Sequence, residues 1–180
     1  ETVTPDLRLN IGGGDIEIPG FVNIDRKHGR EAYPLTDYAD NSVEEIYASH
    51  ILEHFGRAKT IDVLKEWCRV LKPGGRLRVA VPDLEYFCRE YMAQNQTVDL
   101  GWIMGGQIHP DDFHKTAFDE HGLRHCLAAA GFVCMKRFGP EYADCTQLAV
   151  SLNIAANKAT ANVGAKGCQI KLHAVMSMPA

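Results

Sequence analysis

The chain has 180 residues, of which 46% are hydrophobic and 23% are charged. These values are typical of one soluble globular domain with a hydrophobic core of its own. The formal net charge of -4 argues against a general nucleic-acid binder, so we expect no nucleic-acid partner. The chain shows neither a membrane-spanning run nor a signal-peptide pattern, and its six cysteines are scattered without a Cys-x-x-Cys pair. We therefore expect a cytoplasmic protein with reduced thiols.

The first part of the chain predicts three strands. An apolar strand over Leu7–Ile11 runs directly into three glycines at 12–14. A second strand over Phe21–Ile24 ends at Asp25. A third strand is predicted at 45–48, after a turn.

The middle of the chain alternates helix and strand. Residues 58–71 carry hydrophobic side chains at helical spacing, and Lys-Pro-Gly-Gly at 72–75 should end that helix. Alternating hydrophobic residues predict a strand over 76–81. Pro82-Asp83 opens a helix that we expect to reach about residue 94, and residues 96–112 have the composition of a loop.

The last part predicts a helix that Asp119 caps and Gly131 closes, followed by strands over 132–138 and 149–155. A further strand is expected at 170–176. Strands that alternate with helices indicate a mostly parallel sheet with helices on both faces. Ligands of such sheets bind beyond the carboxyl ends of the strands.

Three features fall at that edge: the glycine loop, Asp25 and the dipeptide Ser49-His50. Glycines allow a backbone to pass close to a ligand, and an acid at the end of the neighbouring strand can accept hydrogen bonds from both ribose hydroxyls. Together they predict a pocket for a nucleoside-containing cofactor. A plain tight turn and a solvated acid are the alternatives.

The order of motifs resembles a known family. The motifs are Leu-Asn-Ile-Gly-Gly-Gly at 9–14, Asn-Ile-Asp at 23–25, the block 40–54, the block 66–77 and Leu123–Phe132. In this order they resemble the class I S-adenosylmethionine-dependent methyltransferases, of the small bacterial, type 11-like kind. The resemblance implies an α/β, Rossmann-like sheet, mostly parallel with an antiparallel late strand. It also implies a methyltransferase domain over residues 1–157 and a C-terminal tail over 158–180.

The chain departs from this family's pattern near its beginning. Asn10 stands where members have an acid, and Ile16 stands where they have a third spaced glycine. The connection from Gly14 to Asp25 is too short for a full crossover helix, since parallel strands normally need a dozen or more residues. The first crossover helix should therefore be abbreviated, which predicts an exposed sheet face that a second subunit (a homodimer) or an N-terminal segment covers.

The resemblance implies the enzyme activity and the site residues. The cofactor would be S-adenosyl-L-methionine, and the methyl group would go to a small-molecule acceptor of the sugar or glycan-precursor kind. A cofactor-binding module without turnover is the first alternative. The implied cofactor-binding residues are Asn10, Gly12, Gly13, Gly14, Asp25, Arg26, Asp37, Tyr38, Ser49 and His50. For Asp37 and Tyr38, an ordinary loop is an equal alternative.

Two histidines are candidate catalytic bases, because histidine titrates near neutral pH. His50 would lie at the active-site edge, or else begin a helix as a structural residue. His114 belongs to a polar cluster with His109, Asp111 and Asp112, which forms either a substrate-side lid or a solvated loop.

A zinc hydrolase is the second alternative. His50-x-x-Glu53-His54 matches the inverted zinc-protease pattern, in which two histidines bind zinc and the glutamate acts as a base. Five-residue patterns arise by chance, and we otherwise expect Glu53 and His54 to have a structural role. A metal at His109 and His114 would lack a third clear ligand. The sequence therefore predicts no metal site.

Overall fold

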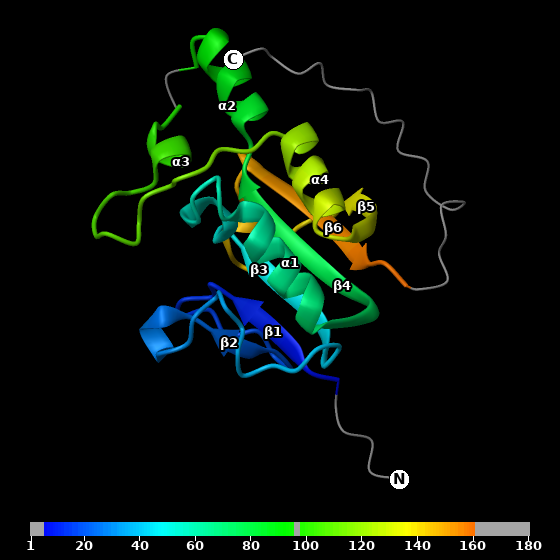
Figure 1. Cartoon of the computed structure of the whole chain (residues 1–180). Helices are drawn as coiled ribbons and strands as arrows, with labels where there is room; N and C mark the ends of the chain where they lie inside the picture. Colours follow the sequence, from blue (N-terminus) through cyan, green and yellow to red (C-terminus); the bar gives the residue numbers. More distant parts are fainter. Residues whose placement is uncertain (1–5, 96–97, 161–180) are drawn as a thin grey trace.

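The computed structural model describes residues 6–95 and 98–160 (Figure 1). Its centre is a six-stranded sheet with the strand order β2-β1-β3-β4-β6-β5. The strands are β1 (Arg8–Ile11), β2 (Val22–Ile24), β3 (Val43–Ser49), β4 (Leu71–Pro82), β5 (Phe132–Arg137) and β6 (Ser151–Lys158). The order reverses after β1, since β2 and β3 lie on opposite sides of it, and ligands bind at such a switch point in α/β sheets.

The sheet is mixed. Strand β1 pairs in parallel with β2 and β3, and β3 pairs in parallel with β4. Strand β6 is antiparallel to both of its neighbours, β4 and β5. This confirms the predicted sheet, mostly parallel at its beginning and antiparallel at its end.

The helices are α1 (Thr60–Val70), α2 (Leu84–Met92), α3 (Gly101–Met104) and α4 (Glu120–Ala129). Short 3-10 turns are η1 (Arg26–His28), η2 (Leu52–His54) and η3 (Cys145–Gln147). Helix α1 ends where the Lys-Pro-Gly-Gly motif predicts, and the motif itself forms an irregularity in β4, where the pairing with β3 jumps from Leu71 to Arg76. Asp119 caps α4 by accepting a hydrogen bond from Gly122 N, as its position before the helix predicts.

Helices α1 and α4 contact each other and pack on one face of the sheet (Figure 1). Leu9, Ile46 and Leu77 lie in register on that face and are fully buried beneath Trp67 and its neighbours. Helix α2 buries none of its residues and contacts α3 instead. The expectation of helices on both faces is therefore wrong for the described residues. The aromatic side of α2 packs on Trp102, not on the sheet.

The other face is covered by a loop. Tyr47 and Arg78 are neighbours in register on that face, yet they are only 1% and 3% exposed. The Tyr142 ring packs edge-on against Tyr47 at a centroid distance of 5.1 Å, and the Tyr47 hydroxyl donates to Asp144. The expectation of an exposed face at this position is wrong, because the segment after β5 folds back over it. The homodimer stays a prediction.

The connection from β1 to β2 contains no helix, which confirms the abbreviated crossover. Two asparagines hold the loop that replaces it. The Asn10 amide donates to Ile16 O, and the Asn23 amide donates to Gly14 O, both at 2.9 Å. Asn10 is only 2% exposed, so its side chain supports the loop from below.

Some predictions fall outside the described residues. The strand predicted at 170–176 is one of them. The division at residue 157 stays a prediction, with β6 reaching Lys158. Within residues 6–95 and 98–160, no helix is both long and apolar enough to cross a membrane. The five cysteines in those ranges are free thiols.

Candidate functional site

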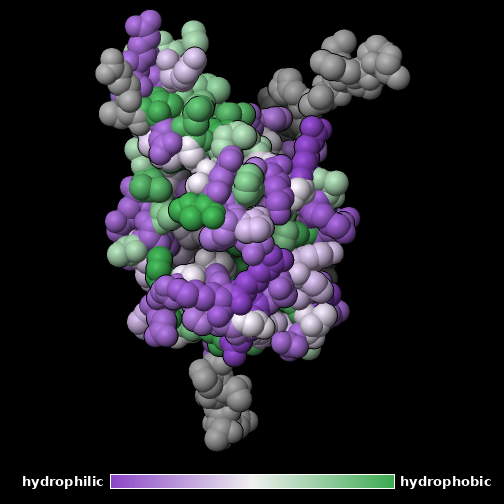
Figure 2. All heavy atoms as spheres, turned by 90° about the vertical axis from the view of Figure 1, so that its left-hand side faces the viewer, coloured by the Kyte–Doolittle hydropathy of each residue, from purple (hydrophilic) through white to green (hydrophobic). Residues whose placement is uncertain are grey.

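A large pocket lies at the carboxyl ends of β1, β2 and β3. Its volume is about 700 Å³, within the range of small-molecule sites. The side of the molecule shown in Figure 2 is hydrophilic over most of its lower half, while hydrophobic side chains gather in its upper half. The pocket residues are Gly12, Gly14, Ile24, Asp25, Arg26, Lys27, Glu31, Ala32, His50, Ile51, His54, Phe55, His109, Asp111, Asp112 and Lys115.

The glycine loop forms one wall of this pocket. A Cβ atom at residue 12 would lie 2.6 Å from the Cβ of Ile51, and this residue also has a φ of +72°. A Cβ atom at residue 13 would lie 2.2 Å from the Asn10 amide nitrogen. Glycine is therefore required here for packing as well as for backbone conformation, and the backbone at Gly12 and Gly14 is left bare toward the pocket.

Asp25 stands at the end of β2 and lines the pocket. One carboxylate oxygen accepts from Gly14 N at 2.9 Å, and the other accepts from Lys27 N at 2.9 Å. The carboxylate thus ties the glycine loop to the start of η1. Each oxygen has a further lone pair, which can accept from a ligand hydroxyl.

Arg26 bridges two sides of the pocket. Its guanidinium bonds Glu31 at 2.9 Å and Asp111 at 2.5 Å, across 85 residues of sequence. These groups are more than half exposed, so the pairs contribute little stability. They do, however, link the loop that carries His109 and Asp111 to Arg26 across the pocket.

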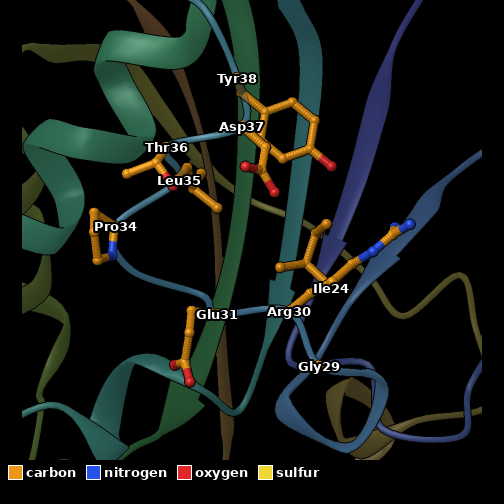
Figure 3. A pocket seen from close by; sticks show the side chains of 9 residues that line it. All are labelled: Ile24, Gly29, Arg30, Glu31, Pro34, Leu35, Thr36, Asp37 and Tyr38. Atoms are coloured by element: carbon orange, nitrogen blue, oxygen red, sulfur yellow. The ribbon is translucent and has the colours of Figure 1, made fainter.

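A smaller cavity of about 260 Å³ adjoins the first, sharing Ile24 and Glu31 as lining residues. In Figure 3, the side chains of Asp37 and Tyr38 lie on the opposite side of this cavity from Gly29. Burial raises the pKa of the Tyr38 hydroxyl. The loop is anchored to α1, because the Arg69 guanidinium donates to Tyr38 O and Leu35 O.

His50 follows β3 in a left-handed conformation, with a φ of +52°. Such a conformation is uncommon for a residue with a side chain and occurs often at functional sites. Its Nε2 lies 2.9 Å from Ser151 Oγ, and its Nδ1 lies 3.4 Å from Glu53 Oε1. The ring is therefore fixed from both sides at the edge of the pocket.

A second histidine cluster lies beside His50. Glu53, His54 and His114 place their ligand atoms within 4.8 Å of one another. The zinc pattern had paired His50 with His54, whereas the structure brings in His114 from another part of the chain. His114 faces Glu53 at 3.9 Å and does not line the pocket.

The predicted site residues are distributed as follows. Gly12, Gly14, Asp25, Arg26 and His50 line the large pocket, with Asp37 and Tyr38 on the smaller cavity. Asn10, Gly13 and Ser49 lie outside both linings, in the layer behind them. The lining residues that sequence reasoning missed include Ile51, Phe55 and Lys115. The hydrophobic pair carried no distinguishing signal, since both look like core residues of a turn.

The comparisons with known proteins agree with this geometry. Residues 23–79 match the family model of a methyltransferase domain. This match spans Asp25, the loop of the smaller cavity, His50 and α1. Over these residues the chain is similar to a methyltransferase domain.

Solved structures show the same fold. A SAM-dependent methyltransferase from Archaeoglobus fulgidus is 17% identical, with a TM-score of 0.57, and the match covers 85% of this chain and 86% of that one. One from Methanosarcina mazei is 18% identical with a TM-score of 0.57, covering 88% and 95%. One from Thermotoga maritima, described as a possible histamine N-methyltransferase, is 19% identical with a TM-score of 0.54, covering 87% and 84%. No curated protein matches the chain.

The residues present fit S-adenosylmethionine, the cofactor that the family resemblance implies. The bare backbone at Gly12 and Gly14 leaves room for the amino-acid part of the cofactor. A Cβ at residue 12 would displace Ile51, which also lines the pocket, and would reduce this room. Asp25 stands at the strand end next to it with free acceptor positions for a ribose. The large pocket and the adjoining cavity together offer the volume that such a nucleoside needs.

Proposed function

We propose that this chain is an S-adenosylmethionine-dependent methyltransferase that transfers the methyl group to a small polar acceptor of the sugar or glycan-precursor kind. The observation that carries the cofactor half of the proposal is the pairing of Asp25 with the glycine loop in one pocket wall. The acceptor half is supported by the polar residues on the opposite side, His109, Asp111 and Asp112. Polar linings of this type favour an acceptor rich in hydrogen-bonding groups.

In this proposal the chain acts mainly by binding and orienting. Asp25 accepts hydrogen bonds from the ribose, and the backbone at Gly12 and Gly14 contacts the amino-acid part. Asp37 and Tyr38 border the adenine from the smaller cavity. S-adenosylmethionine supplies an already activated methyl group when bound, so alignment of the acceptor and exclusion of water are the main tasks that remain.

His50 is the candidate general base in this proposal. Its ring lines the pocket and is held between Ser151 and Glu53. A histidine in this position can take the proton of an acceptor hydroxyl as the new bond forms. His114 lies behind Glu53, so its place favours a role through Glu53 over direct contact with the acceptor. Asn10, Gly13 and Ser49 would act as positioning residues.

We also propose a cytoplasmic setting. Five of the cysteines are free thiols spread over helices, strands and loops. Free, dispersed cysteines are usual in a reducing compartment.

Isothermal titration with S-adenosylhomocysteine tests the cofactor site directly. We expect the wild-type chain to bind this product. Asp25→Asn should weaken binding at least about tenfold, because loss of a charged hydrogen-bond acceptor costs about 1.5 kcal/mol or more. Asp62→Asn is a matched control: Asp62 is exposed and pairs with Lys59, and neither residue lines the pocket. Unchanged affinity in Asp25→Asn would contradict the proposed ribose contact.

A second assay separates an enzyme from a binding module. The purified chain is incubated with radiolabelled S-adenosylmethionine and a panel of sugars and glycan precursors. Transfer of label to one of these, lost in His50→Gln with product binding retained, is the expected result. Transfer only to acceptors without hydroxyl groups would refute the proposed acceptor class.

A further inference from the structure

The carboxylate of Glu53 is buried without a hydrogen bond. Glu53 belongs to η2, and its side chain is 1% exposed. Neither of its two oxygens has a hydrogen-bond partner among the described residues. A buried carboxylate is costly unless it is paired or coordinates a metal, so this group requires a positively charged neighbour.

Two imidazoles converge on this carboxylate. Its Oε1 lies 3.9 Å from His114 Nε2, and the rings of His54 and His114 meet at 88° with their centroids 4.8 Å apart. Nδ1 of His54 is also buried without a hydrogen bond. Three polar atoms of the cluster, Oε1 and Oε2 of Glu53 and Nδ1 of His54, therefore lack partners within the described chain.

The backbone holds the cluster in place. Lys115 N and Thr116 N both donate to Glu53 O, at 2.8 Å and 3.1 Å. The Thr116 hydroxyl donates to Phe55 O at 2.8 Å, and His114 N donates to Met104 O at 3.1 Å. The two segments that supply the cluster, about 60 residues apart in sequence, are thus joined directly after His114, and His114 itself is held by Met104. Such a preformed arrangement is what a metal site requires.

A protonated histidine is the alternative source of positive charge. His50 Nδ1 lies 3.4 Å from Glu53 Oε1 and can supply one proton to it. That proton would leave Glu53 Oε2 and His54 Nδ1 unsatisfied. A neutral imidazole is the form that binds metals, and one cation at the centre would satisfy all three unpaired atoms.

We propose that Glu53, His54 and His114 bind one divalent transition-metal ion of the zinc type. Two imidazole nitrogens and one carboxylate form a ligand set that suits zinc and its neighbours and leaves coordination positions open. His54 also lines the large pocket, so the open side of the ion faces the acceptor space. His50, whose Nδ1 faces Glu53, stands in the outer shell of the site.

This site departs from the expectation of no metal. It also differs from the zinc hydrolase pattern, because Glu53 is a ligand here and not a base. That the ion would bind an oxygen of the acceptor rests on the proposed function, whereas metal binding itself does not.

The test measures metal uptake without cofactor or acceptor. The purified chain is stripped with a chelator and titrated with Zn²⁺ by calorimetry and with Co²⁺ by visible absorption. We expect one equivalent of each, with ligand-field bands typical of few-coordinate Co²⁺. Loss of an outer-shell partner weakens metal binding about 10- to 100-fold. His54→Gln and His114→Gln each remove a ligand, so they should weaken Zn²⁺ binding by more than this. His50→Gln should weaken it by no more than that amount.

His121→Gln is the matched control, since His121 lies exposed on α4, outside the cluster. Thermal melts of the metal-free variants check folding. If a histidine variant fails to fold, Glu53→Gln keeps the test valid: removing the unpaired charge should leave the metal-free protein at least as stable while abolishing Zn²⁺ binding. The proposal is wrong if the wild-type chain takes up no stoichiometric Zn²⁺ or Co²⁺, or if the ligand variants bind like His121→Gln.

Asp25→Asn separates this proposal from the proposed function. It should lose affinity for S-adenosylhomocysteine and keep the metal, because Asp25 is not part of the cluster. Failure of metal binding with normal product binding would overturn only the metal site. The opposite pattern would overturn only the cofactor site.

Discussion

Gly13→Ala should disrupt the glycine loop by displacing its two supports. The new Cβ would lie 2.2 Å from the Asn10 amide nitrogen and 2.5 Å from Asn23 Oδ1, distances that side chains do not tolerate. Both amides would have to move, and each donates one hydrogen bond that holds the loop, to Ile16 O and to Gly14 O.

The magnitude follows from these two bonds. A lost hydrogen bond costs about 1 kcal/mol, and a buried polar group left unsatisfied costs about 1–3 kcal/mol. Some of the groups can regain water at the loop surface, so we expect a total of about 2–4 kcal/mol. For a domain of this size, this corresponds to a fall in melting temperature of about 4–16 °C.

Urea unfolding and thermal melts measure this loss, with Gly139→Ala as the control. Gly139 has no heavy atom within 4 Å of its built Cβ, so the same chemical change should stay within about 0.5 kcal/mol of wild type. Because Gly12 and Gly14 line the pocket, Gly13→Ala should also weaken S-adenosylhomocysteine binding. A Gly13→Ala protein as stable as Gly139→Ala would refute the close packing of the loop on its two asparagines.

Two further predictions concern the segments that frame the site. The Arg69 guanidinium lowers the pKa of Glu66 from its ordinary value of 4.5. The stability that this contact contributes is therefore present above about pH 4.5, and it is lost as the pH falls through the lower pKa of the folded state. Glu66→Gln should therefore lower the free energy of unfolding at pH 7 by about 1–2 kcal/mol and flatten its dependence on pH below 4.5. Urea unfolding at several pH values measures both effects, and an unchanged slope of unfolding free energy against pH would contradict this reasoning. Tyr47→Phe removes the hydroxyl that donates to Asp144 under the covering loop, and it should lower the free energy of unfolding by about 1–3 kcal/mol. Tyr91→Phe, on the exposed side of α2, should change it by almost nothing. Equal effects of the two substitutions on urea unfolding would argue against a buried Tyr47.

The elements that sequence reasoning predicted are those with a strong local signal. Three of them occur as predicted: the strand that ends in three glycines, the helix that Lys-Pro-Gly-Gly terminates and the helix that Asp119 caps. Turn chemistry and hydrophobic spacing act over a few residues, so they are readable without knowledge of the fold. The carboxyl-end pocket followed from the strand order that such a pattern favours.

Sequence reasoning failed where a segment's neighbours decide the outcome. Tyr47 and Arg78 look like side chains of an uncovered sheet face, and only the return of the loop at Tyr142 buries them. The alternation of strands and helices predicts helices on both faces of the sheet, yet α2 contacts α3. No local pattern distinguishes these outcomes.

The sequence by itself determined the bare-backbone loop and the acid beside it, because both depend on residue types at short spacing. Only the tertiary structure decided which histidines meet. His54 had been paired with His50 four residues earlier, whereas backbone bonds from Lys115 and Thr116 to Glu53 bring His114 to it from about 60 residues away. Contacts between distant segments depend on how loops close over the sheet, and that closure leaves no periodic trace in the chain.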